Sequence, residues 1–271
     1  MPEGPEIRRA ADKLEQAIVG QPLRSVAFAF AHLKTFEDEL AASRVSAIET
    51  RGKALLTHFA NGLSVYSHNQ LYGRWYVVKA GALPKTTRSL RFAVRGAKQD
   101  ILLYSASDIE VLDESGIATH PFLQKLGPDV LAPRLTVAKI ESRLADVRFA
   151  RRRLADLLLD QGFLAGIGNY LRSEILFEAG LLPTRRPGSL TPVERAALAQ
   201  SVLAICRRAY RLAGITNDPA RAAALKADGV SFGRRRHAAF ERAGEDCYRC
   251  GGTIETADLN RRVFWCAGCQ G

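Results

Sequence analysis

The residues with the clearest chemistry are four cysteines near the end of the chain. They form two Cys-x-x-Cys pairs, Cys247 with Cys250 and Cys266 with Cys269, separated by fifteen residues. Four thiolates at this spacing predict a tetrahedral zinc site with no open ligand position, so the Zn²⁺ ion would be structural. The intervening sequence, GGTIETADLNRRVFW, predicts a β-hairpin with Asp-Leu-Asn near its tip. A fifth cysteine, Cys206, lies in an apolar helical pattern and is expected to be buried.

A glycine-rich segment, DQGFLAGIGN at residues 160–169, interrupts two helical patterns. Gly166 and Gly168 allow a tight turn, and the helix that follows would present backbone N–H groups that attract phosphate. Asn169 could cap this helix or donate its side-chain amide to the same phosphate. Three arginines at 151–153 strengthen the interpretation as an anion site, although a glycine pair between helices is often only a turn.

Two polar segments fall in the β-rich part of the chain. SHNQLYG at 67–73 joins two strand-like runs, either as a hairpin whose Leu71 or Tyr72 begins the next strand, or as a wedge. A wedge of this kind fills the hole left when a nucleotide is extracted from a duplex. TRGK at 50–53 places a lysine directly after a glycine turn, where a lysine is usually solvated.

The chain begins MPEGPEI, which on its own reads as the start of a helix. Pro5 suits the first helical turn and Glu6 complements the positive end of the helix dipole. The sequence from 5 to 20 predicts an amphipathic helix with one apolar face formed by Ile7, Ala11, Leu14 and Ile18.

The remaining patterns predict an α+β protein with several domains. Short β-rich runs between about 23 and 113 predict an antiparallel sandwich or barrel. Helical periodicity dominates beyond 134, and Thr191 begins a helix with a capping box. The Ala/Arg-rich segment 219–236 predicts no particular element. We expect four parts: a helix plus antiparallel β-sandwich at 1–122, a Pro/Gly-containing linker at 123–133, a helical domain at 134–235, and a zinc finger at 236–271.

Composition and charge point to a polyanionic partner. The net charge is +11, and it is unevenly spread: residues 1–120 hold 15 basic and 13 acidic side chains, whereas 121–271 hold 24 and 15. Such an excess favours nucleic acid as a partner. The chain has no apolar run of about 18 residues and no signal-peptide pattern at its start, so we expect a cytoplasmic protein.

Five motifs in this order carry a family resemblance: MPEGPEI, TRGKALLTHF, YSHNQLYG, LLDQGFLAGIGNYLRSEIL and the terminal four-cysteine finger. The chain resembles the formamidopyrimidine-DNA glycosylase family, in particular its endonuclease VIII branch, which acts on oxidised pyrimidines. The likeness covers essentially the whole chain and is weakest at about 30–45, 80–100 and 183–236. It implies a helix-two-turn-helix motif in the helical domain. It also implies a bifunctional DNA glycosylase and apurinic/apyrimidinic lyase that acts on damaged double-stranded DNA in base excision repair.

The resemblance assigns the chemistry to the start of the chain. It implies that Met1 is removed and that the new N-terminal Pro2 is the nucleophile, whose secondary amine can form a cationic iminium with the sugar C1′. It gives Glu3 the acid/base role, with Glu6 as a helper on the same side. Lys53 matches the family lysine that contacts phosphate and assists loss of the base.

Further residues match the family's DNA contacts. Gln70, Leu71 and Tyr72 match the void-filling loop of the endonuclease VIII branch, and Asn169 matches the phosphate-binding asparagine. Arg261 matches the finger arginine, since four residues separate it from Cys266. The hairpin is shorter than the family pattern, however, so Arg262 remains an alternative.

Two other functions stay open from the sequence. One is the 8-oxoguanine and formamidopyrimidine branch of the same fold, which has a lesion-capping loop near 219–236. The other is a non-catalytic zinc-dependent DNA-binding module, which would show steep salt dependence and no strand cleavage. Nothing in the sequence indicates an oligomer, so a monomer is expected.

Overall fold

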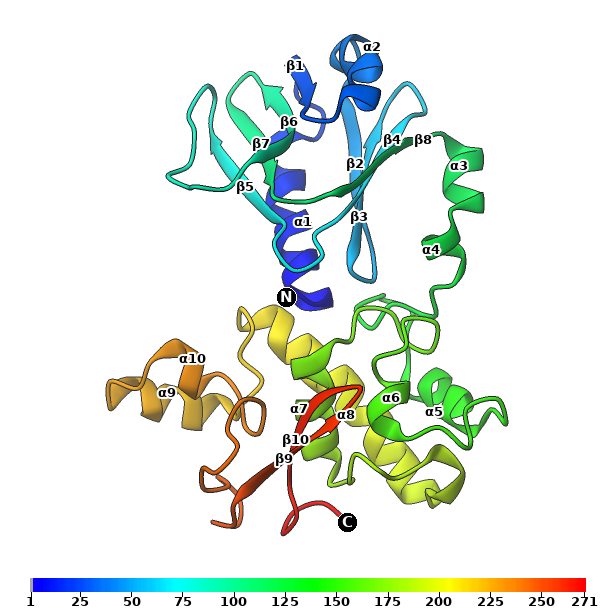
Figure 1. Ribbon diagram of the computed structural model, residues 1–271, viewed down its shortest axis with the longest axis vertical. Coiled ribbons are helices and arrows are strands. Elements are labelled where there is room, and N and C mark those ends of the chain that lie inside the picture. Colours follow the sequence, from blue (N-terminus) through cyan, green and yellow to red (C-terminus); the bar gives the residue numbers. More distant parts are fainter. Residues whose placement is uncertain (1) are drawn as a thin grey trace. The chain divides into compact units, whose positions relative to one another are not determined.

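The computed structural model describes residues 2–271, and its chain forms two compact units. Residue 2 and residues 6–125 make the first unit, whereas residues 3–5 join residues 126–271 in the second. The fold is the expected α+β one, with antiparallel sheets in the first unit and mainly helices in the second (Figure 1). The finer division into four parts remains a prediction.

Two antiparallel four-stranded sheets form the first unit, together with helix α1 (Gly4–Ile18). One sheet has the order β1-β6-β7-β5, comprising Leu23–Phe28, Leu90–Gly96, Gln99–Tyr104 and Arg74–Lys79. The other has the order β2-β3-β4-β8, comprising Val45–Arg51, Ala54–Phe59, Ser64–His68 and Asp108–Leu112. This arrangement confirms the predicted sandwich.

The core of this unit combines α1 with side chains from both sheets. The predicted apolar face of α1 is buried at all four positions, Ile7, Ala11, Leu14 and Ile18. Phe28 and Phe92 stack between β1 and β6 with ring centroids 4.7 Å apart. Burying such aliphatic and aromatic side chains supplies the main favourable free energy of folding.

Short helices fill the connections that the sequence left unassigned. They are η1 (Ala31–Phe36), α2 (Glu37–Ala41), α3 (Glu114–Thr119) and α4 (Pro121–Gln124). Glu37 fastens the first pair to the sheet, because its Oε1 accepts a hydrogen bond of 2.7 Å from the backbone N–H of Phe28. This contact explains how helical turns lie within a β-rich stretch.

The loop at 69–73 connects the two sheets and is not a hairpin turn. β4 pairs with β3 and β8, whereas β5 pairs with β7 in the other sheet. The hairpin interpretation was therefore wrong, and Leu71 and Tyr72 do not begin β5. Both lie in the loop, with 61% and 68% of their surface exposed.

Helices and a terminal hairpin make up the second unit. The helices are α5 (Val137–Ala145), α6 (Leu154–Leu157), α7 (Asn169–Ala179), η2 (Pro187–Ser189), α8 (Pro192–Arg211), α9 (Pro219–Ala227) and α10 (Phe232–Arg235). The hairpin consists of β9 (Ile254–Leu259) and β10 (Arg261–Cys266). Helix α7 lies at the centre of the unit, because every residue from 170 to 177 is buried. Cys206 is fully buried in α8, and Thr191 forms the predicted capping box at its start.

The structure corrects one helix prediction and resolves one open segment. Of the helical pattern that precedes the glycine-rich segment, only the four-residue α6 forms a helix, because the backbone N–H groups of Leu154 and Ala155 donate to the carbonyls of Arg185 and Pro183. In the open segment, Asp218 caps α9 and Pro219 occupies its first turn. Segment 219–236 thus forms α9 and α10, joined by a turn at 228–231.

Candidate functional site

The carboxylate of Glu3 lies at the N-terminus of α7. Its oxygens accept hydrogen bonds from the backbone N–H groups of Gly168 (2.7 Å), Tyr170 (2.9 Å) and Leu171 (3.3 Å). Glu3 is 2% exposed, so these bonds form away from water. Backbone N–H donors and the positive end of the helix dipole both stabilise the ionised carboxylate.

Three glycines make this approach possible. The N–H of Gly4 donates to the carbonyl of Gly166 at 2.8 Å, and a Cβ on Gly4 would lie 3.0 Å from Cα of Gly166. Gly166 has φ of +102°, a conformation that side chains disfavour. A Cβ on Gly168 would lie 2.7 Å from Cγ of Glu3 and closer still to its carboxyl group. The glycine turn therefore positions the start of the chain.

The α7 N-terminus differs from the sequence prediction in two respects. Gly168 is the N-cap residue and Asn169 is the first residue of the helix, so Asn169 does not cap it. Three of the N–H groups expected to face phosphate are instead taken by Glu3. The second proposed role of Asn169, donation from its side-chain amide, remains a prediction.

Arg172 connects α7 to the tip of the terminal hairpin, and it was not among the residues predicted from the sequence. It is fully buried and donates to the backbone carbonyls of Arg261 (2.9 Å) and Arg262 (3.0 Å) and to Oδ1 of Asn169 (2.6 Å). Burial lowers the pKa of Arg172 to about 10, against the opposing effect of nearby carboxylates. The available signal was weak, because Arg172 lies next to two other polar residues, Ser173 and Glu174, in the run NYLRSEIL.

These contacts fix the backbone of the hairpin tip while its arginines stay exposed. Asn169 Nδ2 donates to the carbonyl of Arg262 at 3.0 Å, and Asn260 at the turn donates to Asp156 at 2.7 Å. The side chains of Arg261 and Arg262 are both exposed. Successive strand residues point to opposite faces, so the two arginines cannot present the same contact. Within the second unit, Glu3, Asn169 and the hairpin tip all lie at one end of α7.

The four predicted cysteines come together in the second unit. The Sγ atoms of Cys247, Cys250, Cys266 and Cys269 all lie within 4.8 Å of one another. The Cys247–Cys269 and Cys250–Cys266 sulfur pairs are 3.7 Å and 3.4 Å apart. Zn–S bonds of about 2.3 Å in tetrahedral geometry place sulfur atoms roughly 3.8 Å apart, so the cluster can hold a metal ion.

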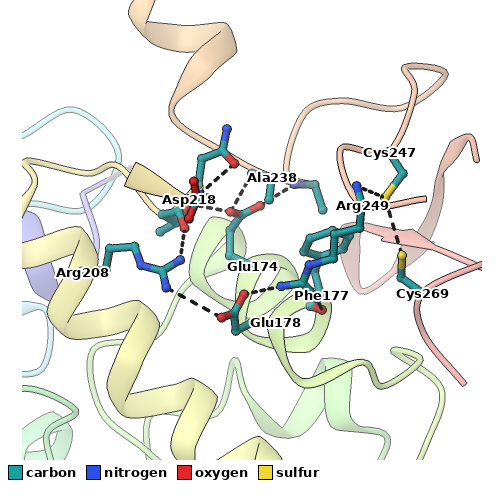
Figure 2. Close-up of polar contacts among 12 residues, drawn as sticks. Glu174, Phe177, Glu178, Arg208, Asp218, Ala238, Cys247, Arg249 and Cys269 are labelled. Atoms are coloured by element: carbon teal, nitrogen blue, oxygen red, sulfur yellow. Dashed lines mark hydrogen bonds and ion pairs between the residues drawn. The ribbon is translucent and has the colours of Figure 1, made fainter. Parts of the chain in front are cut away.

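Glu174 on α7 anchors residues 236–240, which follow α10 and form neither helix nor strand (Figure 2). The buried carboxylate accepts hydrogen bonds from the backbone N–H groups of Ala238 (2.8 Å), Ala239 (2.8 Å) and Phe240 (2.9 Å) and from Oγ1 of Thr216 (2.6 Å). This carboxylate was not singled out in the sequence, because its partners lie 42 to 66 residues away.

Glu178, one helical turn further along α7, links the cysteine cluster to α8. Figure 2 shows Arg249 and Arg208 on either side of its carboxylate. Arg249, which lies between Cys247 and Cys250, donates to Glu178 at 2.5 Å, and Arg208 lies 3.7 Å from the other carboxylate oxygen. Helix α7 thus positions the turn at Glu3, the segment after α10 and the cysteine cluster.

The first unit holds the other predicted residues. Lys53 lies between β2 and β3 and is only 8% exposed, so the expectation of a solvated lysine was wrong. Pro2 and Glu6 are half-buried. Leu71 and Tyr72 project into solvent beside Gln70, which is also exposed. The chemical roles of these residues remain predictions. Pro2 directly precedes Glu3, whose carboxylate is held at the N-terminus of α7.

Comparison with known families identifies the class of protein. The N-terminal domain model of formamidopyrimidine-DNA glycosylase matches residues 1–106, and the H2TH domain model of the same family matches residues 126–219. The chain belongs to this family and is a DNA glycosylase with apurinic/apyrimidinic lyase activity in base excision repair. The alternative of a non-catalytic binding module is therefore excluded.

Individual relatives define the branch. The chain is 53% identical to Endonuclease 8 of Salmonella agona (strain SL483) and 53% identical to Endonuclease 8 of Shigella flexneri, over 100% of each chain. These identities support the endonuclease VIII branch.

Solved structures agree on the fold. A complex between Lactococcus lactis Fpg and DNA containing an abasic site matches with a TM-score of 0.81 at 21% identity, covering 99% of both chains. Within residues 2–271, no helix is long and apolar enough to cross a membrane.

Proposed function

We propose that this chain excises oxidised pyrimidines from damaged double-stranded DNA and uses Pro2, after loss of Met1, as its nucleophile. The position of Glu3 carries the proposal. Its carboxylate is fixed by three backbone N–H groups and is joined through one peptide unit to the Pro2 amine. The N-terminal amine also titrates nearer neutrality than a lysine, so more of it is free base at pH 7.

The reaction begins with a proton transfer from Pro2 to the neighbouring Glu3. The carboxylate takes a proton from the Pro2 ammonium, and the free amine attacks C1′ of the damaged nucleotide. The N–C1′ bond forms as the base departs with the electrons of the glycosidic bond. The amine then loses its remaining proton. The C1′–O4′ bond breaks, O4′ takes a proton from Glu3, and the iminium forms. Glu6 supports these proton transfers.

The iminium drives strand cleavage, because it withdraws electrons from C2′ and makes its proton acidic. Loss of that proton expels the 3′ phosphate, and a second elimination expels the 5′ phosphate. Lys53, Asn169 and either Arg261 or Arg262 hold the phosphates, while Gln70, Leu71 and Tyr72 fill the space left by the extracted nucleotide. The enzyme acts as a monomer.

Borohydride trapping tests the nucleophile and the substrate together. The Met-processed protein should form a covalent adduct with a duplex that contains thymine glycol, because borohydride reduces the iminium to a stable amine. Peptide mapping should place the adduct on Pro2. A protein that keeps Met1 should not cross-link, since its proline nitrogen is an amide. An adduct on another residue would overturn the mechanism, and faster release of 8-oxoguanine than thymine glycol would overturn the substrate assignment.

We also propose that the cysteine cluster holds one structural zinc ion. Elemental analysis should find about one zinc per chain, and Cys250→Ala should lose it, because three thiolates no longer close the tetrahedron. Hydrogen exchange of residues 245–271 should rise in the metal-free protein, whereas exchange in β2, β3 and β4 should not change. Cys206→Ala is the matched control and should retain the zinc. Full zinc content in Cys250→Ala would contradict the assignment.

A further inference from the structure

The loop between β4 and β5 contains an exposed residue that is held at both its backbone and its side chain. The backbone N–H of Gln70 donates to Nδ1 of His68 at 3.1 Å. The hydroxyl of Ser107 donates to Oε1 of Gln70 at 3.0 Å. An exposed glutamine normally samples several rotamers, and fixing one is entropically unfavourable. These two bonds therefore preorganise Gln70 before any ligand arrives.

His68 is suited to hold the backbone of Gln70 in its unusual conformation. Gln70 has φ of +49°, in the left-handed region that non-glycine residues disfavour. Burial lowers the pKa of His68 and so keeps the ring neutral, with Nδ1 as an acceptor; Asp108 opposes this effect and Lys53 adds to it. The ring also packs edge-on against Phe122, with centroids 5.5 Å apart.

The remaining backbone of the loop is fixed as well. Gly73 donates to the carbonyl of Asn69 at 2.7 Å, and a Cβ on Gly73 would lie 2.6 Å from Cα of Asn69, so only glycine fits. Arg88 donates to the carbonyl of Tyr72 at 2.5 Å. The loop backbone thus holds the exposed side chains of Leu71 and Tyr72 in place. Gln70 is the polar residue directly before them.

The bond from Ser107 determines which part of the Gln70 amide is available. Because the hydroxyl donates to Oε1, the NH₂ group is left as the open donor, and within residues 2–271 it has no protein acceptor. We propose that Ser107 is a positioning residue for specificity, which orients Gln70 so that its NH₂ group reads the base opposite the lesion. This inference rests on the proposed void-filling role of residues 70–72.

The chemistry of the bases gives the expected preference. A side chain that fills the space of an extracted nucleotide meets the Watson–Crick edge of the opposite base. The central atom of that edge is an acceptor in adenine (N1) and cytosine (N3), but carries a hydrogen in guanine and thymine. The NH₂ group of Gln70 therefore pairs with adenine or cytosine and opposes a donor in the other two. Adenine or cytosine gains one hydrogen bond from the amide, whereas guanine or thymine leaves one donor unpaired. This difference corresponds to a cleavage rate about tenfold higher opposite adenine or cytosine.

The test uses four duplexes that differ only in the base opposite an abasic site. Single-turnover strand cleavage by the wild-type protein should be about tenfold faster opposite adenine or cytosine than opposite guanine or thymine. Ser107→Ala should reduce this ratio to about twofold, because the amide is then free to rotate. Ser107→Thr, which keeps the hydroxyl, should preserve the ratio. Gln70→Glu should reverse it, because an ionised carboxylate only accepts hydrogen bonds.

The controls separate this inference from the proposed function. Ser115→Ala removes another exposed hydroxyl, which donates to Asp113 at 3.1 Å, and should keep the wild-type ratio. Cleavage at an abasic site requires no damaged base, so failure to release thymine glycol would reject the substrate proposal alone. Wild-type rates within twofold for all four bases, or an unchanged ratio in Ser107→Ala, would reject the role of Ser107. If Ser107→Ala fails to fold, Gln70→Glu decides.

Discussion

Gly168→Ala is expected to reduce strand cleavage at an abasic site by about 10²- to 10³-fold, within the range of about 10²- to 10⁴-fold typical of losing a positioned acid/base group. The new Cβ would lie 2.7 Å from Cγ of Glu3 and would displace its carboxylate from the α7 N-terminus. Gly168 has φ of −130° and ψ of −153°, an extended conformation that alanine adopts. The steric conflict is therefore with Glu3 and not within the backbone. Single-turnover kinetics measure the effect.

A double variant tests whether the loss in Gly168→Ala arises from displacement of Glu3. In Glu3→Ala, the truncated side chain leaves room for the new methyl group, so adding Gly168→Ala should slow the reaction by less than about threefold. Such non-additivity is the signature of two residues that act as a unit. Gly233→Ala is the matched control, since a Cβ there meets nothing within 4 Å, and it should behave as wild type. Additive losses in the double variant would show that Gly168 acts independently of Glu3.

The features that the sequence predicted well depend on local spacing. The two Cys-x-x-Cys pairs, the apolar face of α1 and the capping box at Thr191 each follow from residues a few positions apart, and the structure contains all three. A buried helix face needs only 3.6-residue periodicity, and a metal knuckle needs only two ligands in one turn. The fold class follows from the same kind of pattern, repeated over many short strands.

The features that were missed depend on partners far away in the sequence. Arg172 and Glu174 are examples, because the hairpin-tip acceptors of Arg172 lie 89 and 90 residues away and the donors to Glu174 lie 42 to 66 residues away. The shortened α6 has the same origin, since pairing with residues 183 and 185 replaces helical hydrogen bonds. Propensity and periodicity contain no information about such contacts.

The turn at 160–169 shows how two sequence patterns can combine into one unexpected feature. The sequence indicated an anion-attracting helix N-terminus and, by resemblance, an acid/base group at Glu3. In the structure these are the same feature, because Glu3 supplies the anion that the α7 N-terminus binds. The helix dipole thus acts on the Glu3 carboxylate. Under the proposed function, DNA phosphate is therefore expected to find its donors in side chains such as Asn169 and the exposed arginines of the hairpin.

Glu174→Ala is expected to destabilise the protein by about 3–5 kcal/mol, because it leaves three buried backbone N–H groups without their acceptor. The Thr216 hydroxyl, by contrast, can still donate to the carbonyl of Arg236 or to Nδ1 of His237. Each unsatisfied buried group costs about 1–3 kcal/mol, and partial entry of water offsets part of the sum. Chemical denaturation measures the loss. Native-state hydrogen exchange should locate it at residues 216 and 236–240, the two chain segments that Glu174 holds together.

Glu178→Ala is the control from the same helix. Glu178 is about 29% exposed and its partners are two arginine side chains that water can solvate, so its loss should reduce stability by only about 1 kcal/mol. The two carboxylates are one turn apart on α7. They differ because water can replace Glu178 as the partner of its two arginines, whereas the buried N–H groups bound by Glu174 have no such replacement. Equal losses in the two variants would mean that burial of the N–H groups does not determine the effect. A larger loss in Glu174→Ala, with faster exchange at 236–240, would show that this carboxylate fixes the segment after α10 to α7.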